Sequence, residues 1–415
     1  LICEVESLVS KSYFPYPQVD NTIIADHYFP IVSPFMDHPP LFSLLPGTIQ
    51  TLSGNTWQNP ISLGILRLPM VLLSGLTMWL LYAWSRSWMN RTASLTTLVL
   101  YAVAPSAILG NRMILAENLL TPLMLGQLIL LEPKFNQKIR GLESEFINFL
   151  YPLIKIAGLA MVLAHTLVLM MEKRWREMIG VIAGALIGIS LLIAYASIFD
   201  LEQFLNIQLL QGSYRHTTFL TILLGFFGKP KAIDTIFFDG LLIAAKLSFI
   251  VLAFNLPKKI AVKRMYVFAS VYLIFLAATV GEWVQAPNTS GGHGSYGWYW
   301  YPLFPLFFAS LGYLWTESIT QRKRVFLFII NLFLILQFRL IYLYTGLATL
   351  GNGGLPDWLV LGILGVIGAV SFLPNRWWIR SQWIILSLVI LASIAAILLF
   401  DPIAYSQEAS YFTVI

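Results

Sequence analysis

Residues 178–198 read MIGVIAGALIGISLLIAYASI, an apolar run without one Asp, Glu, Lys or Arg. A helix over such a run rises about 30 Å, which is the thickness of the hydrocarbon core of a bilayer. A second run of this kind, QWIILSLVILASIAAILLF, occupies residues 382–400. These two stretches predict helices that cross a membrane rather than the core of a water-soluble domain.

The composition agrees with this interpretation. Of 415 residues, 58% are hydrophobic and only 11% are charged, whereas soluble domains carry about 25% charged residues. The net charge of +6 is typical of basic cytoplasmic loops in a membrane protein, so we expect no nucleic-acid partner. A single cysteine, Cys3, excludes a disulfide framework and a cysteine-ligated metal site.

Apolar segments recur along the rest of the chain, and each is long enough to cross, or nearly cross, the hydrocarbon core. Backbone groups in hydrocarbon must be satisfied within their own segment, so all are predicted to be helical. They lie near 61–84, 93–110, 113–131, 178–198, 236–255, 265–280, 301–316, 325–344, 358–373 and 382–400. The run 147–171 is interpreted as a helical hairpin that turns near His165. The predicted fold class is therefore an all-α polytopic bundle of about twelve membrane segments.

The basic residues predict the orientation. Seventeen of the 26 Lys and Arg then fall on one side, which the positive-inside rule makes cytoplasmic. They are Arg86, Arg91, Lys134, Lys138, Arg140, Lys173, Arg174, Arg176, Lys258, Lys259, Lys263, Arg264, Arg322, Lys323, Arg324, Arg376 and Arg380. The outer side holds residues 1–60 and the loops 199–235, 281–300 and 346–357. Residues 1–37 contain neither a signal peptide nor a span, and we expect a further membrane helix ahead of Leu1.

The outer segment 1–60 is polar and proline-rich, unlike the helical domain 61–415. Its residues 20–41 read DNTIIADHYFPIVSPFMDHPPL. This string resembles the first outer loop of the protein O-mannosyltransferase and aminoarabinose-transferase superfamily, in which Asp-Glu begins the loop and Asp-His-Pro-Pro-Leu ends it. Asp20 matches the catalytic aspartate of that family, while Asn21 stands where glutamate is usual.

Further matches are Arg67-Leu68-Pro69, Arg112, Leu115-Ala116-Glu117-Asn118, and the aromatic stretch Tyr296–Tyr299 with Pro302 and Pro305. The resemblance implies the GT-C fold and an inverting glycosyltransferase. Its donor would be a monosaccharide on polyprenyl phosphate, and its acceptor a protein, a glycolipid or a polysaccharide. It also implies a multi-pass protein of a prokaryotic plasma membrane with an extracytoplasmic active site.

Two carboxylates are the candidate catalytic residues. Asp20 would act as the general base on the acceptor hydroxyl, with Asp26 as the alternative base. Glu117 lies inside a predicted span, where an ionised side chain marks a functional site or a structural ion pair. For the ion pair, the expected partner of Glu117 is Arg112 or Arg67.

Cations and polar groups are expected to hold the donor phosphate, since fixed positive charges stabilise a leaving phosphate. The candidates are Asp37, His38, Arg67, Arg112 and Arg339. The alternatives are structural: Asp37 as the N-cap of a short helix with Pro39 and Pro40 in its first turn, His38 packed at that helix start, and arginines that reach the headgroups.

Contacts to the sugar or the acceptor are expected from Arg215, Trp298 and Tyr299, although such aromatic residues also form interfacial belts. No His, Asp and Glu set has the spacing of a dedicated metal site, so no metal cofactor is expected.

Two other functions fit the same residues. A secondary transporter or lipid flippase would use Glu117, Lys246 and Arg339 as its intramembrane path. A non-catalytic relative that binds lipid-linked sugar is the other, and the Asn21 substitution keeps it open.

Overall fold

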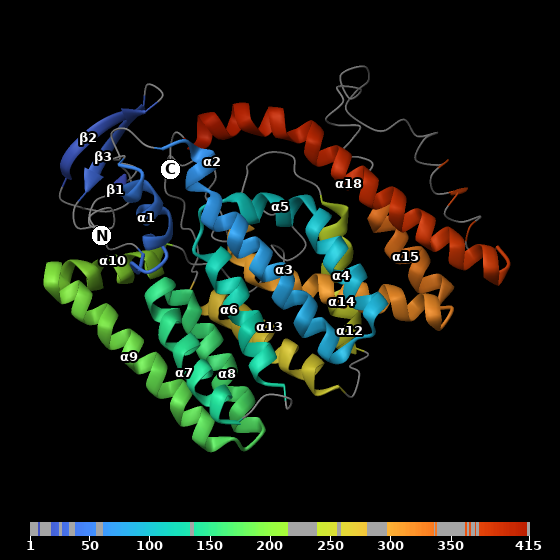
Figure 1. The fold of residues 1–415 in the computed structure, drawn as a ribbon, viewed down its shortest axis with the longest axis horizontal. Coiled ribbons are helices and arrows are strands. Elements are labelled where there is room, and N and C mark those ends of the chain that lie inside the picture. Colours follow the sequence, from blue (N-terminus) through green and yellow to red (C-terminus); the bar gives the residue numbers. More distant parts are fainter. Residues whose placement is uncertain are drawn as a thin grey trace.

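The computed structural model of the protein describes residues 7–8, 18–24, 27–32, 38–54, 61–132, 137–214, 239–254, 259–279, 297–335 and 373–412, with isolated positions between 337 and 370. Within these ranges the chain is a bundle of helices with one small sheet at its edge (Figure 1). The predicted helical class is confirmed for the bulk of the chain.

The small sheet lies in the outer segment, residues 1–60, for which no strand was predicted. Strands β1 (Ser7–Leu8), β2 (Gln18–Ile24) and β3 (His27–Val32) are antiparallel, with β3 in the middle. The tight connection pairs Ile24 with His27. Valine, isoleucine, threonine and aromatic residues are frequent in 18–32, and such side chains favour a pleated surface. This is the local signal that hydropathy alone did not reveal.

The helices follow one another along the rest of the chain. They are α1 (Leu44–Leu52), α2 (Leu63–Leu66), α3 (Leu68–Trp88), α4 (Arg91–Val103), α5 (Pro105–Arg112), α6 (Glu117–Leu130), α7 (Gln137–Ile154), the 3-10 turn η2 (Ile156–Gly158), α8 (Leu159–Met171), α9 (Trp175–Phe199), α10 (Leu201–Tyr214), α12 (Gly240–Phe254), α13 (Ile260–Thr279), the 3-10 segment η3 (Gly297–Leu303), α14 (Phe304–Thr320), α15 (Arg324–Ile335) and α18 (Asn375–Phe412).

Four helical stretches in the described ranges are long and apolar enough to cross a membrane: Gly64–Trp88, Trp175–Phe199, Ile260–Ala277 and Asn375–Leu398. The bent pair α4 and α5 makes a fifth if it is one span. The structure therefore does not confirm the predicted total of twelve segments. The predicted span 93–110 is bent by 63° because Pro105 follows Ala104, whose backbone is extended.

The run 147–171 is indeed part of a hairpin, made by α7 and α8, but its turn was placed wrongly. The chain turns at Lys155–Gly158, and His165 lies buried within α8. Pro152 sits in the last turn of α7, and a Cβ on Gly158 would lie 2.9 Å from the Tyr151 carbonyl oxygen. Pro152 has no N–H for the helical hydrogen bonding of α7, and Gly158 allows the chain to pack closely on the backbone of Tyr151. Together they explain why the chain turns before His165.

Helices α7, α8 and α9 lie together in the bundle (Figure 1). Glycines on α9 allow its backbone to approach that of α7. A Cβ on Gly184 would come within 2.4 Å of the Glu145 carbonyl oxygen, and one on Gly188 within 2.3 Å of the Phe149 carbonyl oxygen. Small residues of this kind let membrane helices pack closely, since no hydrophobic force drives them together.

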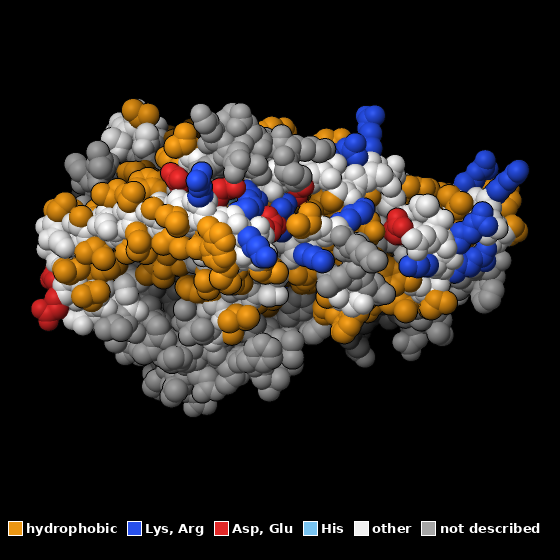
Figure 2. Space-filling model, turned by 90° about the horizontal axis from the view of Figure 1, so that it is seen from below, with side chains coloured by type: hydrophobic (Ala, Val, Ile, Leu, Met, Phe, Trp, Pro, Cys, Tyr) orange, Lys and Arg blue, Asp and Glu red, His pale blue; other side chains and the backbone are white. Residues whose placement is uncertain are grey.

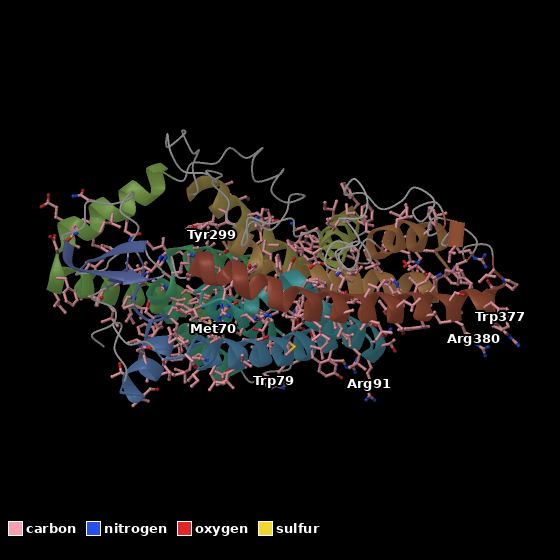
Figure 3. All side chains as sticks on the ribbon, turned by 90° about the horizontal axis from the view of Figure 1, so that it is seen from above. Met70, Trp79, Arg91, Tyr299, Trp377 and Arg380 are labelled. Carbon is pink, nitrogen blue, oxygen red and sulfur yellow. The ribbon has the colours of Figure 1, made fainter. Side chains whose placement is uncertain are left out.

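Charged side chains gather on the face seen from below (Figure 2). Two of the predicted cytoplasmic groups are hydrogen-bonded: Lys259 donates to the carbonyl oxygen of Trp88 at 2.8 Å, and Arg324 donates to Asn375 at 3.0 Å. Trp377 and Arg380 project from one end of the molecule, away from Met70 and Tyr299 (Figure 3).

Candidate functional site

The site is built around a buried ion pair between Glu117 and Lys155. Glu117 is the first residue of α6, and Lys155 lies between α7 and η2. The Lys155 Nζ is 2.5 Å from Glu117 Oε1, and the two side chains are 11% and 1% exposed. The N-terminus of α6 adds its own positive potential at Glu117. The sequence had suggested Arg112 or Arg67 as the partner of Glu117, and the ion pair with Lys155 corrects that expectation.

The aromatic segment η3 covers Lys155. The Nζ of Lys155 lies 4.7 Å from the centre of the Tyr299 ring, a cation–π contact in buried surroundings. Tyr272 of α13 donates its hydroxyl to the Tyr299 carbonyl oxygen at 3.0 Å. Tyr301 packs on α5, where a Cβ on Gly110 would lie 2.6 Å from its ring. Glycine at position 110 is therefore required for η3 to lie this close.

One carboxylate oxygen of Glu117 is left over. No described residue donates a hydrogen bond to Oε2, although the atom is buried. A buried acceptor without a donor costs about 1–3 kcal/mol, and such atoms are rare in folded proteins. An acceptor of this kind beside a partly exposed lysine is suited to meet a ligand donor.

A polar network fixes α7 against α6 below the ion pair. The Tyr151 hydroxyl donates to Gln127 Oε1 at 2.8 Å, and Gln127 Nε2 donates to Asn148 Oδ1 at 2.9 Å. Both amide nitrogens lie within hydrogen-bond distance of His165 Nδ1, at 3.2 and 3.1 Å. These side chains are fully or almost fully buried. Since Tyr151 precedes Lys155 by one turn, the network sets the position of Lys155 relative to α6.

The turn from α5 to α6 positions Glu117. Asn118 Nδ2 donates to the carbonyl oxygens of Gly110 at 2.9 Å and Met113 at 2.6 Å. The same nitrogen is 3.9 Å from Met70 Sδ on α3. Arg67, the N-cap of α3, lies one turn before Met70 and is buried. The candidate phosphate ligand Arg67 is therefore near the start of α6.

The outer segment joins the site through its Pro-Pro-Leu motif. Leu41 donates its backbone N–H to the Leu153 carbonyl oxygen at 2.9 Å, at the end of α7. Pro39 is buried, whereas His38 is exposed. The helix that follows begins at Leu44 with Ser43 as its N-cap, so the expectation that Pro39 and Pro40 lie in its first turn is wrong, while Asp37 lies outside the described residues. The proline pair forms a turn ahead of α1 instead of its first turn.

The remaining predicted residues are only partly described. Asp20 belongs to β2 and pairs with Ile31 of β3, and Arg112 ends α5. Outside the described residues lie Asp26, Asp37, Arg215, Arg339 and the side chains of Asp20 and Trp298. Lys246 is described: it is buried on α12, with its Nζ 5.4 Å from the centre of the Trp300 ring.

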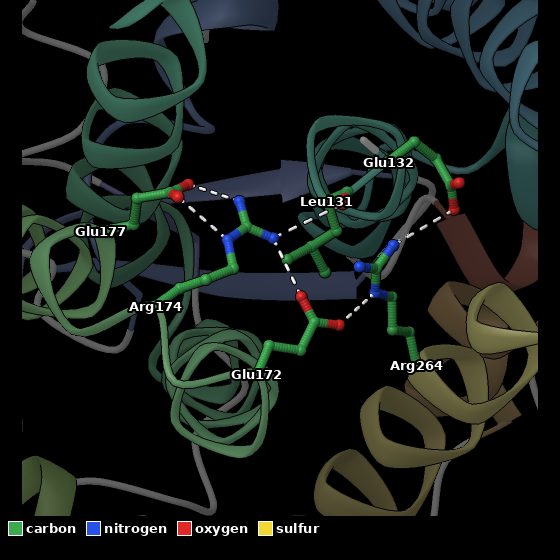
Figure 4. Close-up of polar contacts among 6 residues, drawn as sticks. All are labelled: Leu131, Glu132, Glu172, Arg174, Glu177 and Arg264. Atoms are coloured by element: carbon green, nitrogen blue, oxygen red, sulfur yellow. Dashed lines mark hydrogen bonds and ion pairs between the residues drawn. The ribbon is translucent and has the colours of Figure 1, made fainter. Parts of the chain in front are cut away.

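A separate charged cluster, the Arg174–Arg264 network, lies at the other end of α8 (Figure 4). Arg264 donates to Glu172 at 2.7 Å and pairs with Glu132 at 3.4 Å. Arg174 pairs with Glu177 and with Glu172, and it also donates to the Leu131 carbonyl oxygen. Burial by itself would raise the pKa of Glu172, but its hydrogen bonds to Arg264 and Arg174 and their charges lower it below the usual value. In the part of the chain that the structure describes, no group of three His, Cys, Asp or Glu could hold a metal ion.

Lys155 was missed from the sequence although a signal for it existed. It is the only charged residue inside the apolar run 147–171, and a lysine there marks a functional position or an ion pair. Placing the hairpin turn near His165 put Lys155 at mid-membrane instead of at the turn, which hid its proximity to Glu117.

Neither a family model nor a curated protein matches the sequence. Solved structures do match: ArnT from Cupriavidus metallidurans bound to undecaprenyl phosphate is 15% identical with a TM-score of 0.59, covering 91% of this chain and 70% of that one. The apo state of the same protein is 13% identical with a TM-score of 0.53, covering 89% and 67%. The chain therefore has the fold of ArnT, which is the GT-C fold that the motif at residues 20–41 predicted.

Proposed function

We propose that this chain is a membrane glycosyltransferase that moves a monosaccharide from a polyprenyl-phosphate donor to an acceptor at the outer membrane face. One observation carries the proposal. The outer segment, whose motif contains Asp20, is hydrogen-bonded through Leu41 to the end of α7, beside the buried pair of Lys155 and Glu117. The fold supports the donor class, because the ArnT structure was solved with undecaprenyl phosphate bound.

The chemistry requires one base and a set of cations. Asp20 takes the proton of the acceptor hydroxyl as that oxygen forms a bond to the anomeric carbon of the sugar. The bond from that carbon to the phosphate oxygen breaks, and its electron pair leaves with the polyprenyl phosphate. Attack opposite the leaving group inverts the anomeric configuration.

The phosphate gains negative charge as it leaves, and positive groups held where that charge develops lower the barrier. Lys155, Arg67 and Arg112 are suited to this role at the ends of α7, α2 and α5. His38, Asp37 and Arg339 complete the proposed donor site. Glu117 sets the position of Lys155 and offers its second oxygen to the substrate.

The acceptor is a protein, a glycolipid or a polysaccharide. Tyr299, Trp298 and Arg215 are proposed to contact the sugar or the acceptor, since aromatic faces and arginine forks suit sugars and their anionic groups. The donor arrives within the bilayer on its polyprenyl tail, which agrees with a site at the ends of membrane helices.

The experiment that tests this function is the substitution Asp20→Asn. Membranes that contain the variant are incubated with labelled polyprenyl-phosphate sugars, and transfer is measured for each class of acceptor. We expect a loss of about 10²- to 10⁴-fold, because the base is removed while the shape of the side chain is kept. The amount of folded protein should not change.

Glu202→Gln is the matched control, because Glu202 is an exposed carboxylate at the start of α10. Transfer by the control should equal that of the wild type. Full activity in Asp20→Asn would remove the proposed base. A wild type that binds the donor without turnover would instead identify a non-catalytic lipid-linked-sugar-binding protein.

A further inference from the structure

Glu117 and Lys155 are ordered from the inside of the site toward its surface. The Glu117 side chain is 1% exposed, and the Lys155 side chain is 11% exposed. A ligand that approaches the pair therefore contacts the Lys155 side chain before it reaches the Glu117 carboxylate. An anionic ligand is therefore attracted by the positive charge of Lys155, which also shields the negative charge of Glu117.

In the free protein the Lys155 ammonium group already has an anionic partner. Lys155 neutralises Glu117 through Oε1, and the Oε2 atom finds no donor among the described residues. An incoming phosphate would place a second anion beside one ammonium group. Two anions that share one cation compete for it, and in surroundings poor in water the competition is strong.

We propose that the donor phosphate takes Lys155 away from Glu117, so that an exchange of ion-pair partners accompanies donor binding. The inference rests on the proposed function and assigns Lys155 as one of the phosphate-binding residues of its site. In the free protein Lys155 is held by Glu117, and in the complex it is held by the phosphate.

The side chains allow such an exchange. Lysine is a flexible stem that ends in a compact charge with three donors, so its Nζ can turn from one acceptor to another. The Tyr299 ring lies 4.7 Å from Nζ, and the Tyr299 carbonyl oxygen accepts a hydrogen bond from Tyr272, so the ring stays in place beside Lys155 during the exchange. Glu117 cannot follow, because it is buried at the first turn of α6.

The exchange predicts effects of opposite sign for the two partners. Removing the charge of Lys155 deletes the phosphate ligand and weakens binding. Removing the charge of Glu117 deletes the competitor and strengthens binding, since glutamine leaves Lys155 free for the phosphate. If the ion pair had only a structural role, neutralising Glu117 would weaken binding or leave it unchanged.

The test measures the affinity of purified full-length protein in detergent micelles for undecaprenyl phosphate without sugar. For Lys155→Gln we expect binding weaker by about 10- to 100-fold, the value of a charge-assisted hydrogen bond. For Glu117→Gln we expect binding tighter by about tenfold, while transfer of sugar falls because the proposed function uses that carboxylate. Lys155→Arg keeps the charge and should bind more tightly than Lys155→Gln.

Lys173→Gln is the control, because Lys173 is an exposed lysine at the other end of α8 and should leave binding unchanged. A cooperative thermal unfolding transition shows that a variant is folded. If Lys155→Gln does not fold, the affinities of Glu117→Gln and Lys155→Arg, each compared with the wild type, still test the inference. The inference is wrong if folded Glu117→Gln binds no more tightly than the wild type, or if Lys155→Gln binds equally well. A wild type that does not bind the lipid at all would overturn the donor class of the proposed function as well.

Discussion

The two charged clusters of this molecule differ in how fully their groups are paired. In the Arg174–Arg264 network, Glu172 accepts from both arginines, Arg264 also reaches Glu132, and Arg174 also reaches Glu177 and a backbone carbonyl. At the opposite helix ends, Lys155 forms an ion pair with one carboxylate oxygen of Glu117, and no described residue donates a hydrogen bond to the other oxygen.

The difference separates a structural cluster from the cluster that we propose to be functional. A buried charge is tolerated when hydrogen bonds satisfy it, and the Arg174–Arg264 network meets this condition while tying α6, α8, α9 and α13 together. The site keeps an acceptor without a donor among the described residues and a partly exposed cation, so both groups can still interact with a ligand. Neutralising the network should therefore change stability, and neutralising the site should change binding and rate.

The largest expected effect in this comparison comes from Arg264→Met. The substitution leaves Glu132 without its cation and Glu172 with only Arg174, and breaking a buried pair costs roughly 3 kcal/mol or more. Thermal unfolding in detergent should shift to lower temperature, whereas transfer per folded molecule should stay at the wild-type level. The control Arg176→Met removes an exposed arginine nearby and should melt like the wild type. An unshifted melting curve for Arg264→Met would show that the network does not stabilise the fold.

A smaller effect is expected from Tyr299→Leu, which removes the ring that contacts the Lys155 ammonium and keeps an apolar side chain. A desolvated cation–π contact contributes about 1–2 kcal/mol, so the affinity for undecaprenyl phosphate should fall by about 5- to 30-fold. Tyr299→Phe retains the ring and should bind nearly as well as the wild type. Equal losses in both variants would assign the effect to the hydroxyl and not to the ring.

The smallest expected effect is the pH dependence of the stability that Glu172 contributes through the Arg174–Arg264 network. The pKa of Glu172 is lowered in the folded protein, so its contribution to stability is present above the unfolded pKa and is lost as pH falls through the folded pKa. The difference in melting temperature between wild type and Glu172→Gln should be full near pH 7 and should shrink below about pH 4. A difference that grows on acidification would contradict the assignment.

Hydropathy and the outer motif predicted the helical class and the GT-C fold. They also predicted that Glu117 needs either a partner or a function, because an apolar run with one carboxylate can be recognised locally. The β-hairpin of residues 18–32 was missed, since the search for long apolar helices gave little weight to a short run of β-branched and aromatic residues. The turn of the α7–α8 hairpin was misplaced because Pro152 and Gly158 act through close packing, which a hydropathy pattern does not record.

The sequence by itself determined that this chain is a bundle of membrane helices with a Pro-Pro-Leu outer segment, because hydrocarbon imposes length and apolarity on every span. Only the tertiary structure decided which cation meets Glu117. Lys155 is 38 positions away along the chain, and the two meet because Gln127, Tyr151, Asn148 and His165 hold α6 and the α7–α8 hairpin in one register. A contact made across three helices depends on their packing, and no local pattern of residues encodes it.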